Sequence, residues 1–153
     1  SYSKLDSARK FTNKLWNMAR FIQMKREAQN SKLQIPNNLT IKQLSNIAIN
    51  DADKEMIRKT NKLTNEITKH LDSYNFNYAA ETLYDFAWHE FADKHIENVK
   101  NRIDENSFLI LNSSFFIILK LLHPFMPFVT EEIYQRLNFG KSIMVDRWPQ
   151  YEV

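Results

Sequence analysis

The sequence predicts an all-α fold: a helical bundle of four long helices with a short C-terminal helix and an extended tail. Its 153 residues include one glycine and four prolines, fewer than the many turns of a sheet protein require. Apolar residues also recur at intervals of three and four through most of the chain, as on the buried face of a helix. The length is about that of one domain, so we expect residues 1–153 to form a single helical domain.

The first helix is expected from Lys4 to Ala28. One side carries an apolar stripe at helical spacing, which should face the core: Leu5, Ala8, Phe11, Leu15, Met18, Ala19 and Ile22. Residues 30–40 then form a polar, proline-containing connection, which is longer than the usual ~2–8 residues between helices.

The second helix is expected to begin at a cap, Asn50 or Asp51, and to end near Leu71. Its apolar positions are Ala52, Met56, Leu63, Ile67 and Leu71. The third is expected from Tyr78, capped by Asn77, to Ile103. Its inward positions are Leu83, Tyr84, Ala87, Trp88, Phe91, Ala92, Val99 and Ile103.

The fourth helix, 107–122, is apolar on nearly every side, which is typical of a helix at the centre of a bundle. Pro124 and Pro127 should end it, because proline lacks the amide donor. Thr130 is then a suitable cap for the short helix, and Gly140 a suitable end. Residues 141–153 should be extended.

Composition excludes several functions. The chain has no cysteine, so it has no disulfide, thiol nucleophile or thiolate metal site. With Gly140 as its single glycine it cannot form a glycine-rich phosphate loop. The longest apolar run, 115–122, is too short to span a membrane. No secretion signal is recognisable, so we expect a cytoplasmic location. The net charge of +3 permits nucleic-acid binding without requiring it.

No catalytic or metal-binding motif is complete. His89 begins a pattern resembling that of zinc proteases, but these need a second histidine four residues on, and Asp93 stands there. His95 falls on another face of the helix and is interpreted as a core residue. Ser113 and Ser114 lie in the apolar fourth helix with no activating histidine at a suitable spacing. We therefore predict neither catalytic residues nor a metal site.

The polar face of the first helix is more informative, because it combines cations, amides and apolar groups. Cations can neutralise phosphates, amides can bind base edges, and an aromatic ring can stack on an unpaired base. An alternative stays open: the apolar pair could pack under the 30–40 connection while the polar residues are merely solvated. The face comprises Arg9, Lys10, Asn13, Asn17, Arg20, Phe21 and Met24.

Four segments together resemble the anticodon-binding helical domain of class I aminoacyl-tRNA synthetases, and most closely those of the valyl type. They cover most of the chain, and residues 29–70 contribute least. The third segment is characteristic of the subclass that charges valine, isoleucine, leucine and methionine. The segments are ARKFTNKLWNMARF (8–21), YNFNYAAETLYDFAWHEFADKHIENVK (74–100), LLHPFMPFVTEEIYQRL (121–137) and SIMVDRWP (142–149).

The resemblance implies an RNA-binding role in protein biosynthesis. In that family the first helix approaches the anticodon, which places Asn13, Asn17 and Arg20 at base edges and Phe21 in a stacking position. Arg9, Lys10 and Lys14 would then contact backbone phosphates. Trp16, outside this set, is interpreted as a packing residue. His123, Pro124, Pro127 and Trp148 are interpreted as architectural.

The resemblance also implies that the chain is a piece of a larger ligase. The family's adenylate-binding signatures do not occur in these residues, so this domain alone should be non-catalytic and hold no cofactor, with ATP bound by the full-length parent. Expected partners are a tRNA anticodon stem-loop, that of a valine tRNA, and the parent's catalytic domain; no membrane contact is expected, and the piece should be monomeric. The alternatives are an isoleucyl or leucyl domain, or a helical module that binds a protein.

Overall fold

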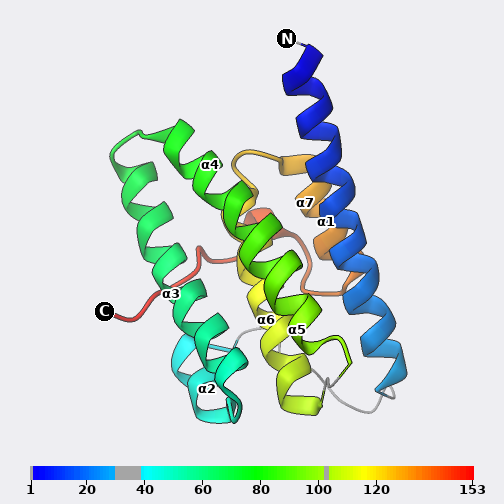
Figure 1. Ribbon diagram of the computed structural model, residues 1–153. Coiled ribbons are helices and arrows are strands. Elements are labelled where there is room, and N and C mark those ends of the chain that lie inside the picture. Colours follow the sequence, from blue (N-terminus) through cyan, green and yellow to red (C-terminus); the bar gives the residue numbers. More distant parts are fainter. Residues whose placement is uncertain (1, 30–38, 102–103) are drawn as a thin grey trace.

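A computed structural model describes residues 2–29, 39–101 and 104–153, and these ranges contain helices and no strand. The predicted all-α bundle is therefore confirmed (Figure 1). The elements in chain order are α1 (Tyr2–Ala28), α2 (Ile41–Ile47), α3 (Asp51–Asp72), α4 (Phe76–Asp85), η1 (Phe86–Ile96), α5 (Glu97–Val99), α6 (Glu105–Leu122), α7 (Pro127–Arg136) and η2 (Ile143–Val145).

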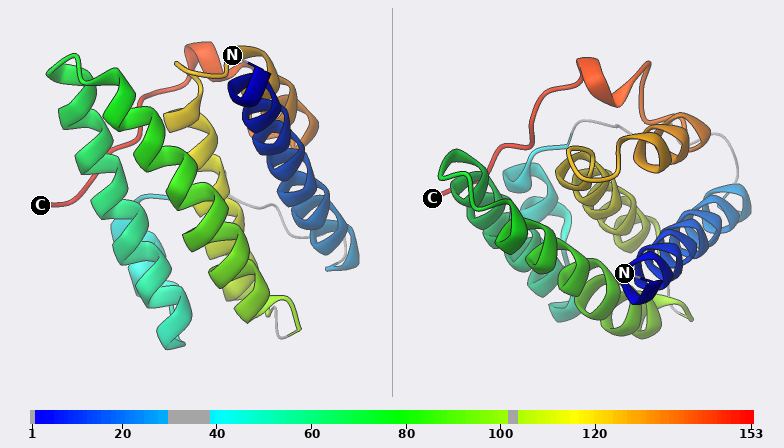
Figure 2. Two further views of the ribbon diagram at one scale, coloured as in Figure 1. Left: turned by 45° about the horizontal axis from the view of Figure 1, so that its top comes forward. Right: turned by 90° about the horizontal axis from the view of Figure 1, so that it is seen from above.

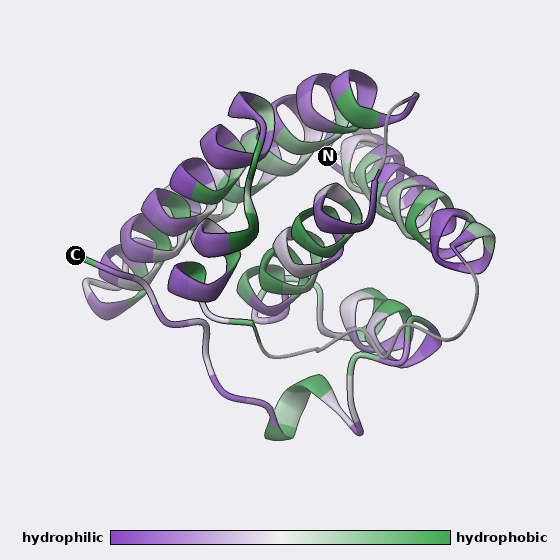
Figure 3. Ribbon diagram, turned by 90° about the horizontal axis from the view of Figure 1, so that it is seen from below, coloured by the Kyte–Doolittle hydropathy of each residue, from purple (hydrophilic) through white to green (hydrophobic). Residues whose placement is uncertain are grey.

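Helix α6 occupies the centre, as its all-round apolar pattern predicts. Figure 2 shows α3 and α4 on one side of it and α1 and α7 on the other, and α6 contacts each of these helices. The apolar faces of the surrounding helices turn toward it (Figure 3). In the described part of the chain α6 alone is long and apolar enough to cross a membrane, but 83% of it is buried in the bundle, where it serves as the core helix.

Helix α1 lies along one flank, and its apolar stripe is only partly buried. Phe11, Leu15 and Ile22 lie in the core, as expected. The prediction for Leu5 and Ala8 is wrong: Leu5 is 73% exposed and Ala8 is exposed as well. The first turns of α1 extend past the end of the bundle, so no helix covers them (Figure 1).

The predicted start of α3 is confirmed, since the Asn50 side chain accepts a hydrogen bond from the Asp53 amide. Helix α2 was not predicted. It begins with a capping box in which Thr40 and Gln43 each bind the other's backbone amide. The predicted connection at 30–40 lies mostly outside the described residues.

The third predicted helix begins earlier and changes its hydrogen-bonding register. It starts at Phe76 with Asn75 at the cap position, so the predicted cap at Asn77 is wrong. Residues Phe86–Ile96 are π-helical, with hydrogen bonds to the fifth residue rather than the fourth. This register explains why Phe86, Phe91 and Ile96 are all buried, although their spacing of five is not α-helical. The predicted end at Ile103 lies outside the described residues.

Both predicted ends of the short C-terminal helix are wrong. Helix α7 begins with Pro127 in its first turn, where the missing amide costs nothing. Thr130 is buried inside the helix, and its hydroxyl donates to the Met126 carbonyl at 2.8 Å. After the helix Asn138 adopts a φ of 54°, so this residue, rather than Gly140, supplies the left-handed turn that ends it.

The tail crosses from α7 to α3 in a mainly extended form, as predicted, with one 3-10 turn at η2. The Glu131 carboxylate on α7 accepts hydrogen bonds from the Ile143 amide at 2.8 Å and from the Ser142 hydroxyl. Further along, the Trp148 indole donates to the Thr68 hydroxyl at 2.9 Å and packs against the core. The architectural interpretation of Trp148 is thus confirmed.

Candidate nucleic-acid interface

The polar face of α1 is open because its opposite face is buried. Leu15, Met18 and Ile22 are at most 3% exposed, which turns Asn13, Asn17 and Arg20 to the outside, where all three are exposed. Arg20 makes no ion pair with any described residue. The structure therefore brings the three predicted base-edge residues together on one exposed helix surface.

Arg9 and Lys10 extend this surface toward the exposed first turns. Both pair with Asp6, at 3.2 and 3.0 Å, and both side chains are more than 60% exposed. The hydrogen bond and charge of Lys10 lower the pKa of the Asp6 carboxyl. Exposed pairs of this kind are weak, so both cations can still exchange Asp6 for a phosphate.

Lys14 is placed differently from the other predicted phosphate contacts. Its side chain is only 27% exposed, and its ammonium lies 2.8 Å from the Asp93 carboxylate of η1 and 5.0 Å from the centre of the Trp88 ring. His89 approaches the same carboxylate at 3.4 Å. The hydrogen bond from Lys14 lowers the pKa of Asp93. Lys14 is thus already neutralised within the protein surface.

Phe21 and Met24 complete the face. Phe21 is half-buried and packs against the core, with the Lys25 ammonium 5.5 Å from its ring centre, whereas Met24 is 55% exposed. The connection that could cover them lies mostly at 30–38, outside the described residues. Phe21 is therefore a fixed ring with an accessible part, which suits a stacking platform.

The aromatic residues of α4 and η1 pack against the apolar stripe of α1, on the side away from the polar face. Phe11 of α1 lies 4.4 Å, centre to centre, from Tyr84 of α4 and 6.4 Å from Trp88 of η1. Burial raises the pKa of the Tyr84 phenol. The spacing of Tyr84 and Trp88 indicated a shared helix face, but nothing in the sequence indicated that this face meets α1.

On its other side the face borders α7. The Arg136 guanidinium lies 5.1 Å from the centre of the Trp16 ring and 3.0 Å from Glu132. The predicted packing of Trp16 is confirmed, since the ring contacts the core. Beside it a hollow of about 280 Å³ is lined by Trp16, Ala19, Arg20, Gln23, Ile133, Arg136 and Leu137.

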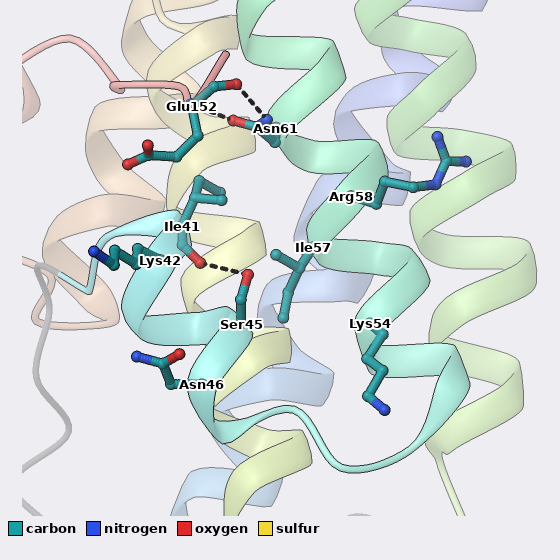
Figure 4. A pocket seen from close by; sticks show the side chains of 9 residues that line it. All are labelled: Ile41, Lys42, Ser45, Asn46, Lys54, Ile57, Arg58, Asn61 and Glu152. Atoms are coloured by element: carbon teal, nitrogen blue, oxygen red, sulfur yellow. Dashed lines mark hydrogen bonds between the residues drawn. The ribbon is translucent and has the colours of Figure 1, made fainter.

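A second hollow, of about 380 Å³, lies between α2, α3 and the tail (Figure 4). It carries Lys42, Lys54 and Arg58, but Arg58 is paired with Glu55 at 2.6 Å. Asn61 fastens the tail here through two 2.8 Å hydrogen bonds with the backbone of Glu152. No aromatic ring lines this hollow, so it lacks the stacking surface found beside α1.

The histidines and serines form no reactive group in the described ranges. His89 is exposed, and His95 is 5% exposed, as the core interpretation predicts. His95 lies 3.9 Å from Asp53, and Asp53 accepts a hydrogen bond from Ser107 at 2.6 Å. Because Ser107 donates to the carboxylate and not to the imidazole, this arrangement fixes α3 to α6 and activates no nucleophile.

Comparison with known proteins fits this geometry. Residues 53–153 match the family model described as the anticodon-binding domain of tRNA ligase. The chain is 40% identical over 152 residues to a valine–tRNA ligase of Fervidobacterium nodosum, a match that covers 96% of this chain and 16% of the relative. A valine–tRNA ligase of Thermotoga maritima is 38% identical, and one of Carboxydothermus hydrogenoformans is 37% identical, with similar coverage.

The chain thus spans about a sixth of the length of these relatives. The family match begins in α3, and the relatives extend the similarity to the α1 face. The expected alternatives, an isoleucyl or leucyl domain or a protein-binding module, are less favoured, because the relatives named here are all valine–tRNA ligases. The chain belongs to the family of anticodon-binding domains of tRNA ligases.

Proposed function

We propose that this chain is the part of a valine–tRNA ligase that recognises the anticodon of its tRNA. The observation that carries the proposal is the open face of α1, where Asn13, Asn17 and Arg20 lie exposed beside the half-buried ring of Phe21. Such a face combines hydrogen-bonding groups for base edges with a ring for stacking, as single-stranded RNA requires.

Recognition on this face would involve no bond chemistry. The anticodon bases unstack, Phe21 stacks on one of them, and the side-chain amides of Asn13 and Asn17 bind base edges with paired donors and acceptors. Arg9 and Lys10 contribute charge toward the backbone phosphates. Isolated binding is expected to be weak and strongly dependent on salt, because phosphate contacts release counterions.

The remaining steps of aminoacylation belong to the rest of such a ligase. We propose that the parent's catalytic domain binds ATP and that the domain formed by this chain holds no cofactor. We also propose that the isolated chain is monomeric and cytoplasmic. A parent ligase that also binds the acceptor stem holds the tRNA at two sites. Its overall affinity is then higher, because binding at one site raises the effective concentration of the tRNA at the other.

A fluorescence titration tests the proposal. The chain is titrated with valine tRNA and with the same tRNA carrying a changed anticodon, at low and near-physiological salt. Weaker binding of the changed tRNA is expected. Equal binding of both would show only generic attraction to phosphate and would contradict the assignment of base-edge residues.

The alternative is a protein-binding module, which rests on two exposed apolar side chains, Met24 at 55% and Phe128 at 89%. The salt dependence of binding and the effect of substitutions distinguish the two functions. An apolar docking surface tolerates salt and fails when these residues are changed. An RNA site loses affinity steeply as salt rises and fails when Asn17 or Arg20 is changed.

A further inference from the structure

The hollow between α1 and α7 has the chemistry of a nucleotide subsite. Of the residues that line it, only Arg20 has a role in the proposed anticodon site. Its wall contains the Trp16 indole, two guanidinium groups from Arg20 and Arg136, and the amide of Gln23, over an aliphatic floor. An aromatic face stacks on a base, an amide binds a base edge, and guanidinium groups bind phosphate. This small space therefore offers partners for the base and for the phosphate of a nucleotide.

Its position also suits an RNA that lies along α1. Arg20 belongs both to the open face and to the wall of the hollow, and Trp16 precedes it by one helical turn. A strand that contacts Asn17 can therefore place a neighbouring nucleotide here. The hollow in Figure 4, by contrast, is lined by α2, α3 and the tail, away from α1.

The accessible face of Trp16 is already covered by a cation that can leave. Arg136 lies 5.1 Å from the ring centre, yet its side chain is 64% exposed and its partner Glu132 is 55% exposed. Cation–π contacts at exposed sites are weaker than stacking of a base on an aromatic ring. Exchange of the guanidinium for a base is therefore favourable, and it releases Arg136 for a phosphate.

We propose that this hollow is a second nucleotide subsite: an unpaired base of the bound RNA stacks on Trp16 in place of Arg136, and Arg20 and Arg136 bind the adjacent phosphate. This inference rests on the proposed function, because it needs the RNA on the α1 face. It adds α7 to the recognition surface and gives Trp16 a role beyond packing.

Fluorine NMR of the chain labelled with 5-fluorotryptophan can detect directly whether a base stacks on Trp16. The chain has three tryptophans, so three resonances are expected, each assigned by a tryptophan-to-phenylalanine substitution. An anticodon stem-loop RNA should shift the Trp16 resonance, whereas a blunt duplex with no unpaired base should not. A Trp16 resonance that is unmoved by the stem-loop, or that moves equally with the duplex, overturns the proposal.

Variants separate stacking from packing. Trp16→Leu should weaken stem-loop binding about tenfold, whereas Trp16→Phe, which keeps a ring, should stay within about threefold. Arg136→Gln should reduce the slope of log K against log salt by about 1, because one phosphate contact is lost. Lys62→Gln on α3 is the matched control, since it removes one exposed positive charge away from α1.

The outcomes also separate this proposal from the proposed function. If the chain discriminates between anticodons but Trp16→Leu binds within twofold of the wild type, the subsite is wrong and the function stands. If no variant and no salt condition gives binding to the stem-loop, the proposed function fails and the subsite fails with it. Thermal unfolding of each variant identifies losses caused by misfolding, and the shift of the Trp16 fluorine resonance in the unsubstituted chain then serves as the test.

Discussion

The Lys14 ammonium on α1 lies 2.8 Å from the Asp93 carboxylate on η1, and it also lies above the Trp88 ring. The pair joins two elements that are distant in sequence, and it neutralises a cation that the family resemblance assigns to the RNA backbone. Asp93 is at the same time a negative charge at the edge of a surface expected to bind a polyanion. A carboxylate there should disfavour loosely placed RNA, because specificity often depends on such repulsion.

Replacing Asp93 by asparagine should therefore increase affinity and reduce selectivity. Lys14 would become available to a phosphate, so binding to valine tRNA should tighten severalfold at low salt, and binding to the changed tRNA should tighten by a larger factor. The slope of log K against log salt should steepen by about 0.9 for the one added phosphate contact. Fluorescence titration at several salt concentrations measures both quantities.

Glu55→Gln is the matched control, since it also removes one acidic partner of a basic side chain but lies on α3, across the bundle from α1 (Figure 1). It should leave the salt slope unchanged. An equal effect of both substitutions would mean that only net charge matters, and an Asp93→Asn variant with unaltered binding would remove Asp93 from the interface.

Asn17→Ala should reduce anticodon discrimination rather than overall attraction. A base-edge contact carries about 1–3 kcal/mol of discrimination, so the ratio of the two dissociation constants should fall about tenfold. Asn46→Ala, an exposed amide on α2, should leave the ratio unchanged. Because Asn17 is exposed, thermal stability should stay within about 0.5 kcal/mol, and a larger loss would indicate a structural role instead.

The candidate face could be predicted from the sequence because its residues follow from the α-helical period of a single helix. A straight α-helix fixes which residues lie opposite the core stripe, so Asn13, Asn17 and Arg20 were found without knowledge of the neighbouring helices. The partners of Lys14 and Trp16 could not be found in this way. Asp93 and Arg136 come from other elements, and their approach depends on how η1 and α7 pack against α1.

The fold was predictable for the same reason. The prediction failed where two local sequence signals competed or where the helix departs from the ordinary period. The start of α3 at Asn50 follows from a single cap, and the central place of α6 follows from composition. The π register of η1 leaves no signal in a pattern interpreted at 3.6 residues per turn. Thr130 has the side chain of a good cap, but Pro127 begins the helix one turn earlier.

The contact of the tail with α6 and α7 should make the free energy of unfolding decrease as the pH becomes acidic. Asp146 accepts a hydrogen bond from the Tyr134 hydroxyl at 2.5 Å and lies 3.4 Å from the Lys120 ammonium. Burial opposes ionisation of Asp146, but these partners outweigh it and lower its pKa. Burial lowers the pKa of Lys120, and burial and the Asp146 contact raise that of Tyr134.

Because the pKa of Asp146 is lower in the folded chain than in the unfolded chain, its stabilisation is complete above the unfolded value and is lost as the pH falls through the folded one. Asp146→Asn should therefore cost about 2 kcal/mol at neutral pH, as expected for hydrogen bonds that involve a charged group. The difference from the wild type should shrink in acid. Urea unfolding at pH 7 and pH 3 measures it, and a constant difference would contradict the assignment.

The single glycine should be required for space rather than for a left-handed backbone. A Cβ built on Gly140 would lie 2.5 Å from the Tyr134 hydroxyl oxygen and 3.2 Å from the ring carbon that bears it. That hydroxyl is held by Asp146, and the Tyr134 side chain is 1% exposed. The ring therefore cannot move aside without losing both its hydrogen bond and its packing.

Gly140→Ala should accordingly destabilise the chain by about 2 kcal/mol, within the range measured for overpacking. Tyr134→Phe should also destabilise it, because Asp146 loses its hydrogen-bond donor. The double variant should be more stable than the sum of the two losses indicates, since removal of the hydroxyl oxygen relieves the closest clash. Urea unfolding of the four proteins gives this coupling directly; strictly additive losses would mean that the clash with the Tyr134 hydroxyl is not why residue 140 must be glycine.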